Sequence, residues 1–154
     1  MSTEKDLDRL DREILRLITR DASLSLAEIA TQVGLTPTPC WKRIRRMEQD
    51  GIILRRVAIL DAEKVGLAVS VFVAIETADH SADWLARFAK VIEDTPEIVD
   101  AWRMAGDVDY LLHVVVPDIS SYDAFYRKLI ATLPLRNVSS RFSMERMKAA
   151  ALPV

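Results

Sequence analysis

The sequence feature that most restricts the possible folds of this chain is a short segment bounded by two glycines, Gly34 and Gly51. Pro37 and Pro39 stand near its start, where they fall in the first turn of a helix. Backbone N–H groups have no intrahelical partner in that turn, so proline is tolerated there. Thr36 is placed to cap the helix with its hydroxyl group. We therefore predict one helix between the two glycines.

This predicted helix has two chemically different faces. Cys40, Ile44 and Met47 recur at the spacing of a buried stripe. The opposite face carries Thr38, Lys42, Arg45 and Gln49, flanked by Trp41 and Arg46. Basic side chains far outnumber acidic ones between residues 41 and 56, although the net charge of the whole chain is −2. Such a helix is either a solvated amphipathic helix or one that binds DNA.

The preceding residues favour DNA binding. Asp8 and Asp11 have the spacing that starts a helix, and Ser25 with Glu28 forms a capping box for a second, short helix that Gly34 ends. A short helix, a glycine turn and a basic helix make the helix-turn-helix pattern, in which the second helix enters the major groove.

A run rich in β-branched residues follows, from residue 52 to residue 60, and we interpret it as a strand that forms a basic wing with Arg55. Residues 61–66 are polar and end in glycine, which indicates a hinge. We therefore divide the chain into a DNA-binding domain at 1–60, a hinge at 61–66 and a second domain at 67–154.

The second domain alternates strand and helix signals. The predicted elements are a strand at 68–77, a helix at 81–93, strands at 98–104 and 110–116, a helix at 120–133 and a last strand at 138–147. This βαββαβ order predicts an α+β, ferredoxin-like domain with both helices on one face of an antiparallel sheet. The sheet valines exceed what one helical layer can cover, so we expect a homodimer; these valines are Val69, Val71, Val73, Val114 and Val116.

Composition excludes several classes of protein. The chain has one cysteine, no leader-like start and no apolar run long enough to span a bilayer, so we expect a cytoplasmic protein without membrane contact. Cys40 is either a redox sensor or a buried core residue, and its helical phase favours the core. His80 and His113 have no clustered ligands, so neither a metal nor another cofactor is expected.

Three motifs in order resemble the leucine-responsive, or feast/famine, transcription regulators of the Lrp/AsnC family. The matching segments are 10–15, residues 33–48 around Arg43 and Ile44, and 106–112. Within the family, residues 40–43, 102–106 and 122–126 are most similar to the branch of cysteine-responsive detoxification regulators. The resemblance covers nearly the whole chain.

The resemblance implies a winged helix-turn-helix domain followed by an amino-acid-sensing domain, assembled as dimers that associate into octamers. Residues assigned to duplex DNA are Thr36, Thr38, Trp41, Lys42, Arg43, Arg45, Arg46 and Arg55. The small amino-acid effector, with cysteine as the leading choice, would bind between dimers. Its assigned residues are Met104, Gly106, Asp107, Val108, Asp109, Ser140 and Phe142.

One segment departs from the family pattern, because the turn at 133–137 before the last strand lacks the usual glycine. Two other functions stay open from the residues themselves. An architectural protein would wrap DNA with little sequence preference. An enzyme would use Asp107 and Asp109 as a carboxylate pair, but an Asp beside Gly is also ordinary turn chemistry, and no nucleophile–base pair accompanies it, so we expect no enzymatic activity.

Overall fold

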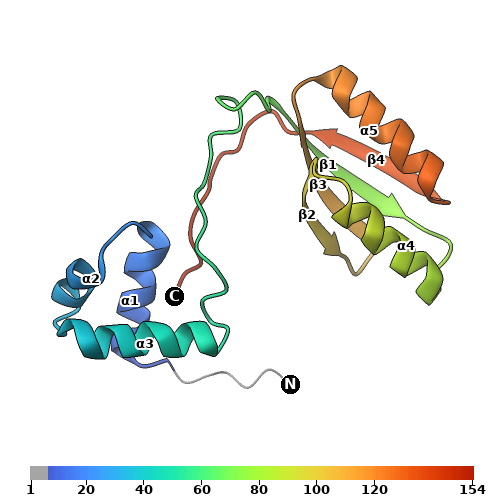
Figure 1. Cartoon of the computed structure of the whole chain (residues 1–154). Helices are drawn as coiled ribbons and strands as arrows, with labels where there is room; N and C mark the ends of the chain where they lie inside the picture. The colour runs from blue at the N-terminus through green and yellow to red at the C-terminus, as the bar shows by residue number, and fades with distance from the viewer. Residues whose placement is uncertain (1–6) are drawn as a thin grey trace. The chain divides into compact units, whose positions relative to one another are not determined.

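Capping boxes begin the first two helices, as predicted. The computed structural model describes residues 7–154 (Figure 1), so residues 1–6 of the predicted first domain lie outside the described part. Asp8 caps α1 (Arg9–Arg20) and exchanges side-chain to backbone hydrogen bonds with Asp11. Ser25 and Glu28 do the same for α2 (Leu26–Gln32). These bonds satisfy N–H groups that the helix itself leaves without partners.

Gly34 and Gly51 end α2 and α3 (Pro37–Gln49) in the same way. Their φ angles are 70° and 71°, in the left-handed region that favours glycine. In both turns the glycine N–H and the next N–H donate back to carbonyls in the last turn of the helix, which is the Schellman arrangement. Gly34 therefore forms the turn between the two helices of the helix-turn-helix, and Gly51 ends its second helix.

The first compact unit comprises the described residues up to Ile59 together with Lys148–Val154. Its core is built from one side of each helix: Ile14, Leu15, Ile18, Ile29, Ala30, Val33, Cys40, Ile44 and Met47. Val154 packs against this core, and its carbonyl oxygen accepts a hydrogen bond of 2.7 Å from Arg16 Nε on α1. The predicted second domain ran to residue 154, so the structure moves the last seven residues into the first unit.

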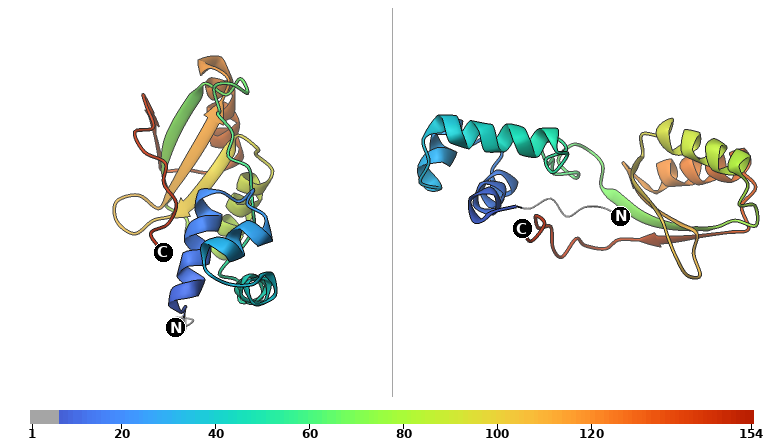
Figure 2. Two further views of the ribbon diagram at one scale, coloured as in Figure 1. Left: turned by 90° about the vertical axis from the view of Figure 1, so that its left-hand side faces the viewer. Right: turned by 90° about the horizontal axis from the view of Figure 1, so that it is seen from below.

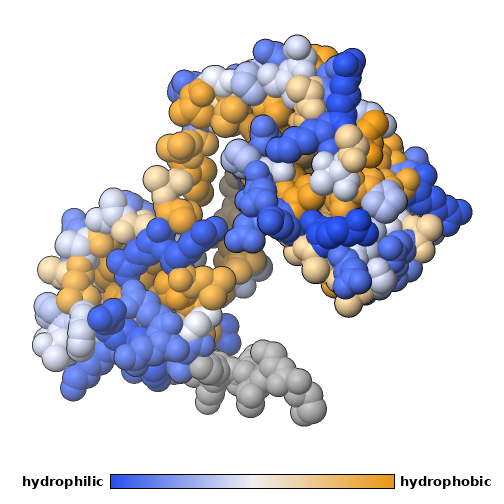
Figure 3. Space-filling model, turned by 45° about the vertical axis from the view of Figure 1, so that its right-hand side comes forward, coloured by the Kyte–Doolittle hydropathy of each residue, from blue (hydrophilic) through white to orange (hydrophobic). Residues whose placement is uncertain are grey.

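The segment after α3 is not a strand within the described chain. Residues 54–60 are extended but have no ladder partner, so the predicted strand at 52–60 is wrong for the single chain. An extended run becomes a strand only when another segment pairs with it. Its apolar side chains are largely exposed (Figure 3), namely Leu54, Val57, Ile59 and Leu60.

The second unit, Leu60–Met147, has the predicted βαββαβ order. Its elements are β1 (Val69–Glu76), α4 (Ala82–Glu93), β2 (Ile98–Arg103), β3 (Tyr110–Val116), α5 (Ile119–Thr132) and β4 (Asn137–Phe142). The antiparallel sheet has the order β2-β3-β1-β4, and both helices lie on one of its faces (Figure 2). The ferredoxin-like prediction is confirmed.

The valines that suggested a surplus of apolar sheet surface all point toward the helices. Val71, Val73, Val114 and Val116 are fully buried there, with Trp84 and Phe88 of α4 and Phe125 and Leu129 of α5. The reason given for a dimer was therefore wrong, because alternate residues of a strand face opposite sides and these valines share the covered side.

The uncovered face of the sheet carries the intervening residues of the strands. Apolar members are Phe72, Ala74, Trp102, Leu111 and Val115. Among them, His113 stacks on Phe72 with ring centroids 4.7 Å apart. The Ser70 hydroxyl lies 2.7 Å from His113 Nε2, and Asp100 Oδ2 lies 3.6 Å from His113 Nδ1. The face thus combines apolar residues of β1, β2 and β3 with this polar trio, and its β4 edge is polar, with Ser139 beside Ala74 and Arg141 beside Phe72.

Candidate nucleic-acid interface and ligand site

The start of α3 is set by its prolines rather than by a side-chain cap. Thr36 occupies the N-cap position with extended backbone, but its hydroxyl makes no capping hydrogen bond, so the predicted capping role is wrong. A cap accepts from the second or third N–H of the helix. Pro39 occupies the third position and has no N–H to donate.

A buried carboxylate holds two of the predicted DNA-binding arginines. The Asp11 side chain is 1% exposed and pairs with Arg43 Nη1 at 2.8 Å and with Arg46 Nη2. Asp8 adds a second contact to Arg43 at 2.6 Å. The Arg43 guanidinium donates hydrogen bonds to the carboxylates of Asp8 and Asp11, and these bonds raise its pKa. The pKa of Asp8 is lowered, first by the hydrogen bond from the Asp11 N–H and then by the one from Arg43.

Arg43 and Arg46 therefore tie α3 to α1 in this structure. Their side chains point toward the supporting helix, although both were predicted to contact DNA. Sequence reasoning assigned Asp11 only to the capping box and missed its second role. The sequence did hold a sign of this role, because Asp11 is an acidic residue on the same face of α1 as the buried residues Ile14, Leu15 and Ile18.

The outer face of α3 carries the remaining predicted contacts. Thr38, Lys42 and Arg45 are exposed, and Trp41 is 49% exposed. The Arg45 guanidinium carbon lies 5.8 Å from the centroid of the Trp41 ring, a cation–π arrangement. Arg45 also pairs with Glu48 at 3.1 Å. This face therefore presents hydrogen-bond donors to the solvent, as a groove-reading helix must.

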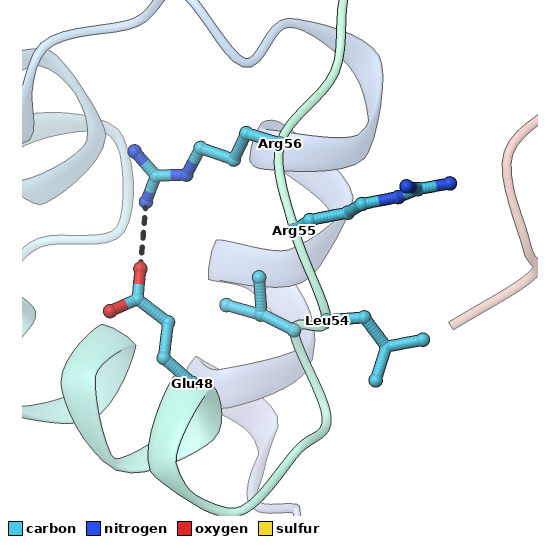
Figure 4. Close-up of a pocket in the computed structure, with 5 residues that line it drawn as sticks. Glu48, Leu54, Arg55 and Arg56 are labelled. Atoms are coloured by element: carbon cyan, nitrogen blue, oxygen red, sulfur yellow. Dashed lines mark ion pairs between the residues drawn. The ribbon is translucent and has the colours of Figure 1, made fainter.

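The segment beyond α3 adds two arginines with different orientations. Glu48, Ile53, Leu54, Arg55 and Arg56 line a surface pocket (Figure 4). Arg56 extends toward Glu48, with 3.6 Å between Arg56 Nη2 and Glu48 Oε1, whereas Arg55 points away from Glu48. Arg55 is exposed, and neither Glu48 nor Arg56 was among the predicted site residues.

Cys40 is fully buried in the core of the first unit, which supports the core interpretation over the redox sensor. Burial raises the pKa of its thiol, and the opposing effect of Arg43 is smaller. A thiol with a raised pKa carries little of the reactive thiolate near neutral pH.

The predicted ligand turn connects β2 to β3. Gly106 has a φ of 127°, and the Met104 N–H donates to the Asp109 carbonyl at 2.8 Å, closing the turn. The Asp109 carboxylate accepts from the Thr77 N–H at 2.8 Å, which fastens the turn to the end of β1. Asp107 is exposed and Val108 is half-buried. The Asp109 carboxylate therefore has a structural role in this turn.

Ser140 and Phe142 lie on the helix side of β4, against Tyr122 of α5. The Tyr122 hydroxyl hydrogen-bonds the Ser140 hydroxyl, and the Phe142 ring meets the Tyr122 ring edge-on at 5.1 Å. Burial raises the pKa of Tyr122. Phe142 is still 44% exposed, so this cluster reaches the surface. Sequence reasoning placed Tyr122 on its helix but missed its contact with the last strand.

One chain does not bring the two halves of the predicted effector site together. The turn lies between β2 and β3, whereas Ser140 and Phe142 lie on β4, and β1 separates β3 from β4. Two strand spacings amount to about 10 Å. The two halves are joined through β1. Its Ile75 carbonyl accepts a hydrogen bond from the Asp109 N–H of the turn, and Val73, two residues earlier on β1, pairs with Ser140 of β4.

Two negative observations apply to residues 7–154. No helix there is both long and apolar enough to cross a bilayer. No group of three or more His, Cys, Asp or Glu side chains in that range is arranged to hold a metal ion.

Comparison with known proteins identifies both units. Residues 7–53 match the winged helix-turn-helix DNA-binding family, and residues 70–152 match the Lrp/AsnC ligand binding domain. The DNA-binding transcriptional activator DecR of Escherichia coli K12 is 47% identical over 150 residues, covering 96% of this chain and 99% of DecR.

Two solved structures share the fold along the chain. An AsnC family transcriptional regulator from Agrobacterium tumefaciens is 57% identical, with a TM-score of 0.88 and coverage of 93% of this chain and 94% of that one. A transcriptional regulator from Neisseria meningitidis, solved in complex with L-Met, is 26% identical, with a TM-score of 0.89 and 94% coverage of both chains. The helix-turn-helix, the ferredoxin-like sheet and these matches establish that the chain belongs to the Lrp/AsnC family of DNA-binding transcription regulators.

Proposed function

We propose that this regulator reads duplex DNA with the outer face of α3 and that a small amino acid changes its DNA binding. The observation that carries the DNA proposal is the division of basic residues on α3. Arg43 and Arg46 pair with Asp11, whereas Lys42 and the stacked pair of Trp41 and Arg45 stay on the exposed face. Thr36, Thr38 and Arg55 are exposed and complete the proposed surface.

This assignment separates base reading from phosphate binding. An arginine that contacts two acceptors of guanine discriminates by about 1–3 kcal/mol, whereas a lysine on phosphate binds all sequences alike. Arg45→Ala should lose preference for a duplex selected from a random pool over a scrambled duplex. Lys42→Ala should weaken binding to both duplexes and lower the salt slope by about one. An unchanged preference in Arg45→Ala would remove Arg45 from the groove.

We propose that the effector binds where two copies of the chain meet. The Gly106–Asp109 turn would supply acceptors for the ammonium group, and Ser140 with Phe142 from another copy would close the site, with Met104 as an apolar wall. The separation of the turn from β4 within one chain supports this arrangement. Cysteine is the proposed effector, on the resemblance of residues 40–43, 102–106 and 122–126 to the cysteine-responsive branch.

A thermal-shift screen of the full chain against the twenty amino acids tests the effector. A ligand that binds only the folded protein raises the melting temperature by mass action. Cysteine should give the largest shift, and methionine is the informative competitor because the Neisseria meningitidis regulator was solved with L-Met. Asp107→Asn should reduce the shift and Glu93→Gln, at the end of α4, should not. Absence of any shift would refute amino-acid sensing.

We propose that the uncovered sheet face forms the dimer and that dimers assemble further, to octamers. Phe72, Leu111 and Trp102 give this face an apolar surface, and Trp102 is 44% exposed in the single chain. Sedimentation velocity should show dimers or larger species, shifted by the effector. Phe72→Asp should give monomers, whereas Leu85→Asp, on exposed α4 surface, should not. A wild-type monomer at micromolar concentration would refute the assembly.

A further inference from the structure

We infer that Glu48 limits the affinity of this regulator for its DNA site by competing with DNA for Arg45, and that Arg56 allows Glu48 to release Arg45. The inference rests on the proposed placement of the outer face of α3 in the groove. It adds an acidic residue that limits affinity, Glu48, and a positioning residue that acts through it, Arg56.

The contacts form a short chain across the end of α3. Glu48 Oε2 accepts from Arg45 Nη1 at 3.1 Å, and Glu48 Oε1 lies 3.6 Å from Arg56 Nη2. The Arg45 guanidinium carbon also lies 5.8 Å from the centroid of the Trp41 ring. Arg45 therefore contacts both a carboxylate and an aromatic ring of its own helix, and Arg56 reaches Glu48 from the extended segment that follows the helix (Figure 4).

The relative strengths of the Arg45–Glu48 pair and of a base contact decide when Arg45 leaves Glu48. An exposed ion pair one helical turn apart changes an equilibrium by only about twofold to fivefold. A bidentate contact with a correct base changes binding by about tenfold to a hundredfold. Arg45 therefore leaves Glu48 where a base offers two acceptors. Where only screened phosphates are near, Glu48 retains Arg45, so Arg45 adds little to binding.

Arg56 determines what happens to Glu48 after Arg45 leaves. Without a second partner, the carboxylate would stand uncompensated beside polyanionic DNA. Arg56 contacts the other carboxylate oxygen and stays in place, so the negative charge remains paired. Arg55 has the same charge on the same segment but points away from Glu48, which makes it a matched control.

A double-mutant cycle on the full-length protein tests the inference. The variants are Glu48→Gln, Arg56→Ala, their combination, and Arg55→Ala with and without Glu48→Gln. Fluorescence anisotropy measures Kd for a duplex selected from a random pool by the wild type and for a scrambled duplex of the same composition. Circular dichroism melting checks that each variant is folded.

Glu48→Gln should tighten binding to the selected duplex by about twofold to fivefold and change the scrambled duplex less, because only the selected duplex takes Arg45 away from Glu48. Arg56→Ala should weaken binding in the wild type and have little effect beside Glu48→Gln. Arg55→Ala should have the same effect in both backgrounds, because it does not act through Glu48.

Three results would overturn the inference. An equal loss from Arg56→Ala in both backgrounds, with a salt slope reduced by about 0.9, would make Arg56 an ordinary phosphate contact. A loss confined to the selected duplex in Glu48→Gln would mean that Glu48 itself reads a base, as a carboxylate does with cytosine. An unchanged specificity ratio in Glu48→Gln would leave Glu48 without this role. Failure of the underlying α3 proposal is seen separately, as an unchanged preference in Arg45→Ala.

Discussion

Asp11→Asn should loosen the DNA-binding unit without changing the shape of the side chain. Asp11 is fully buried, pairs with both Arg43 and Arg46, and accepts from the N–H of Asp8. Asparagine keeps one acceptor oxygen but replaces the other with an amide group that points donors at a guanidinium. Both arginines would then lack their buried partner.

The partial exposure of Arg43 and Arg46 limits the loss of stability expected from Asp11→Asn. Removing one partner of a buried ion pair costs about 3–5 kcal/mol when the other charge stays buried. Here the side chains of Arg43 and Arg46 are 26% and 49% exposed, so water can solvate the released guanidinium groups in part. We therefore expect a loss of about 2 kcal/mol, which corresponds to about thirtyfold faster exchange of protected amides.

Hydrogen-exchange mass spectrometry of the full chain measures this change unit by unit. Peptides from α1 and α3 should exchange faster, and peptides from β1 and β3 should not, because they belong to the second unit. Glu13→Gln is the control, since it removes the exposed Arg9–Glu13 pair on the same helix. Unchanged exchange in α1 and α3 of Asp11→Asn would refute the idea that Asp11 fixes the recognition helix.

Three further predictions concern single side chains. Cys40 should react with a thiol reagent far more slowly in the folded protein than in denaturant at the same pH, because it is buried and its pKa is raised; equal rates would contradict the buried placement. The Ser121 N–H, bonded at 2.7 Å, lowers the pKa of the α5 cap Asp118 below its ordinary value of 3.8. Its stabilisation is therefore present above that value and lost as pH falls through the lower folded pKa, so Asp118→Ser should flatten the loss of helicity seen by circular dichroism below about pH 4. Tyr122→Phe should weaken the effector-induced thermal shift while Tyr126→Phe does not, since Tyr122 holds Ser140.

Local chemistry made most of the fold predictable. Capping boxes and glycine stops involve residues three to six apart, so Asp8, Ser25, Gly34 and Gly51 mark helix ends without knowledge of the rest of the chain. The bounds of β3 and the order of the second unit followed from periodicity alone.

Interactions between distant residues were the ones that sequence reasoning missed. The direction of Arg43 and Arg46 depends on Asp11, more than thirty positions away. Residues 52–60 have strand composition but no partner in one chain, and strand pairing is a property of two segments. The count of sheet valines gave the wrong face, because the total does not show how they alternate across the sheet.

The place of Lys148–Val154 in the first unit affects the order in which the protein folds during synthesis. The three helices that form the DNA-binding head leave the ribosome first, but the segment that packs on α1 through Val154 is translated only after the whole second unit. Domains generally fold as they emerge, so α1, α2 and α3 form a core early and receive their last packing residues late. A nascent regulator therefore exposes part of its head until synthesis has passed the sensing domain.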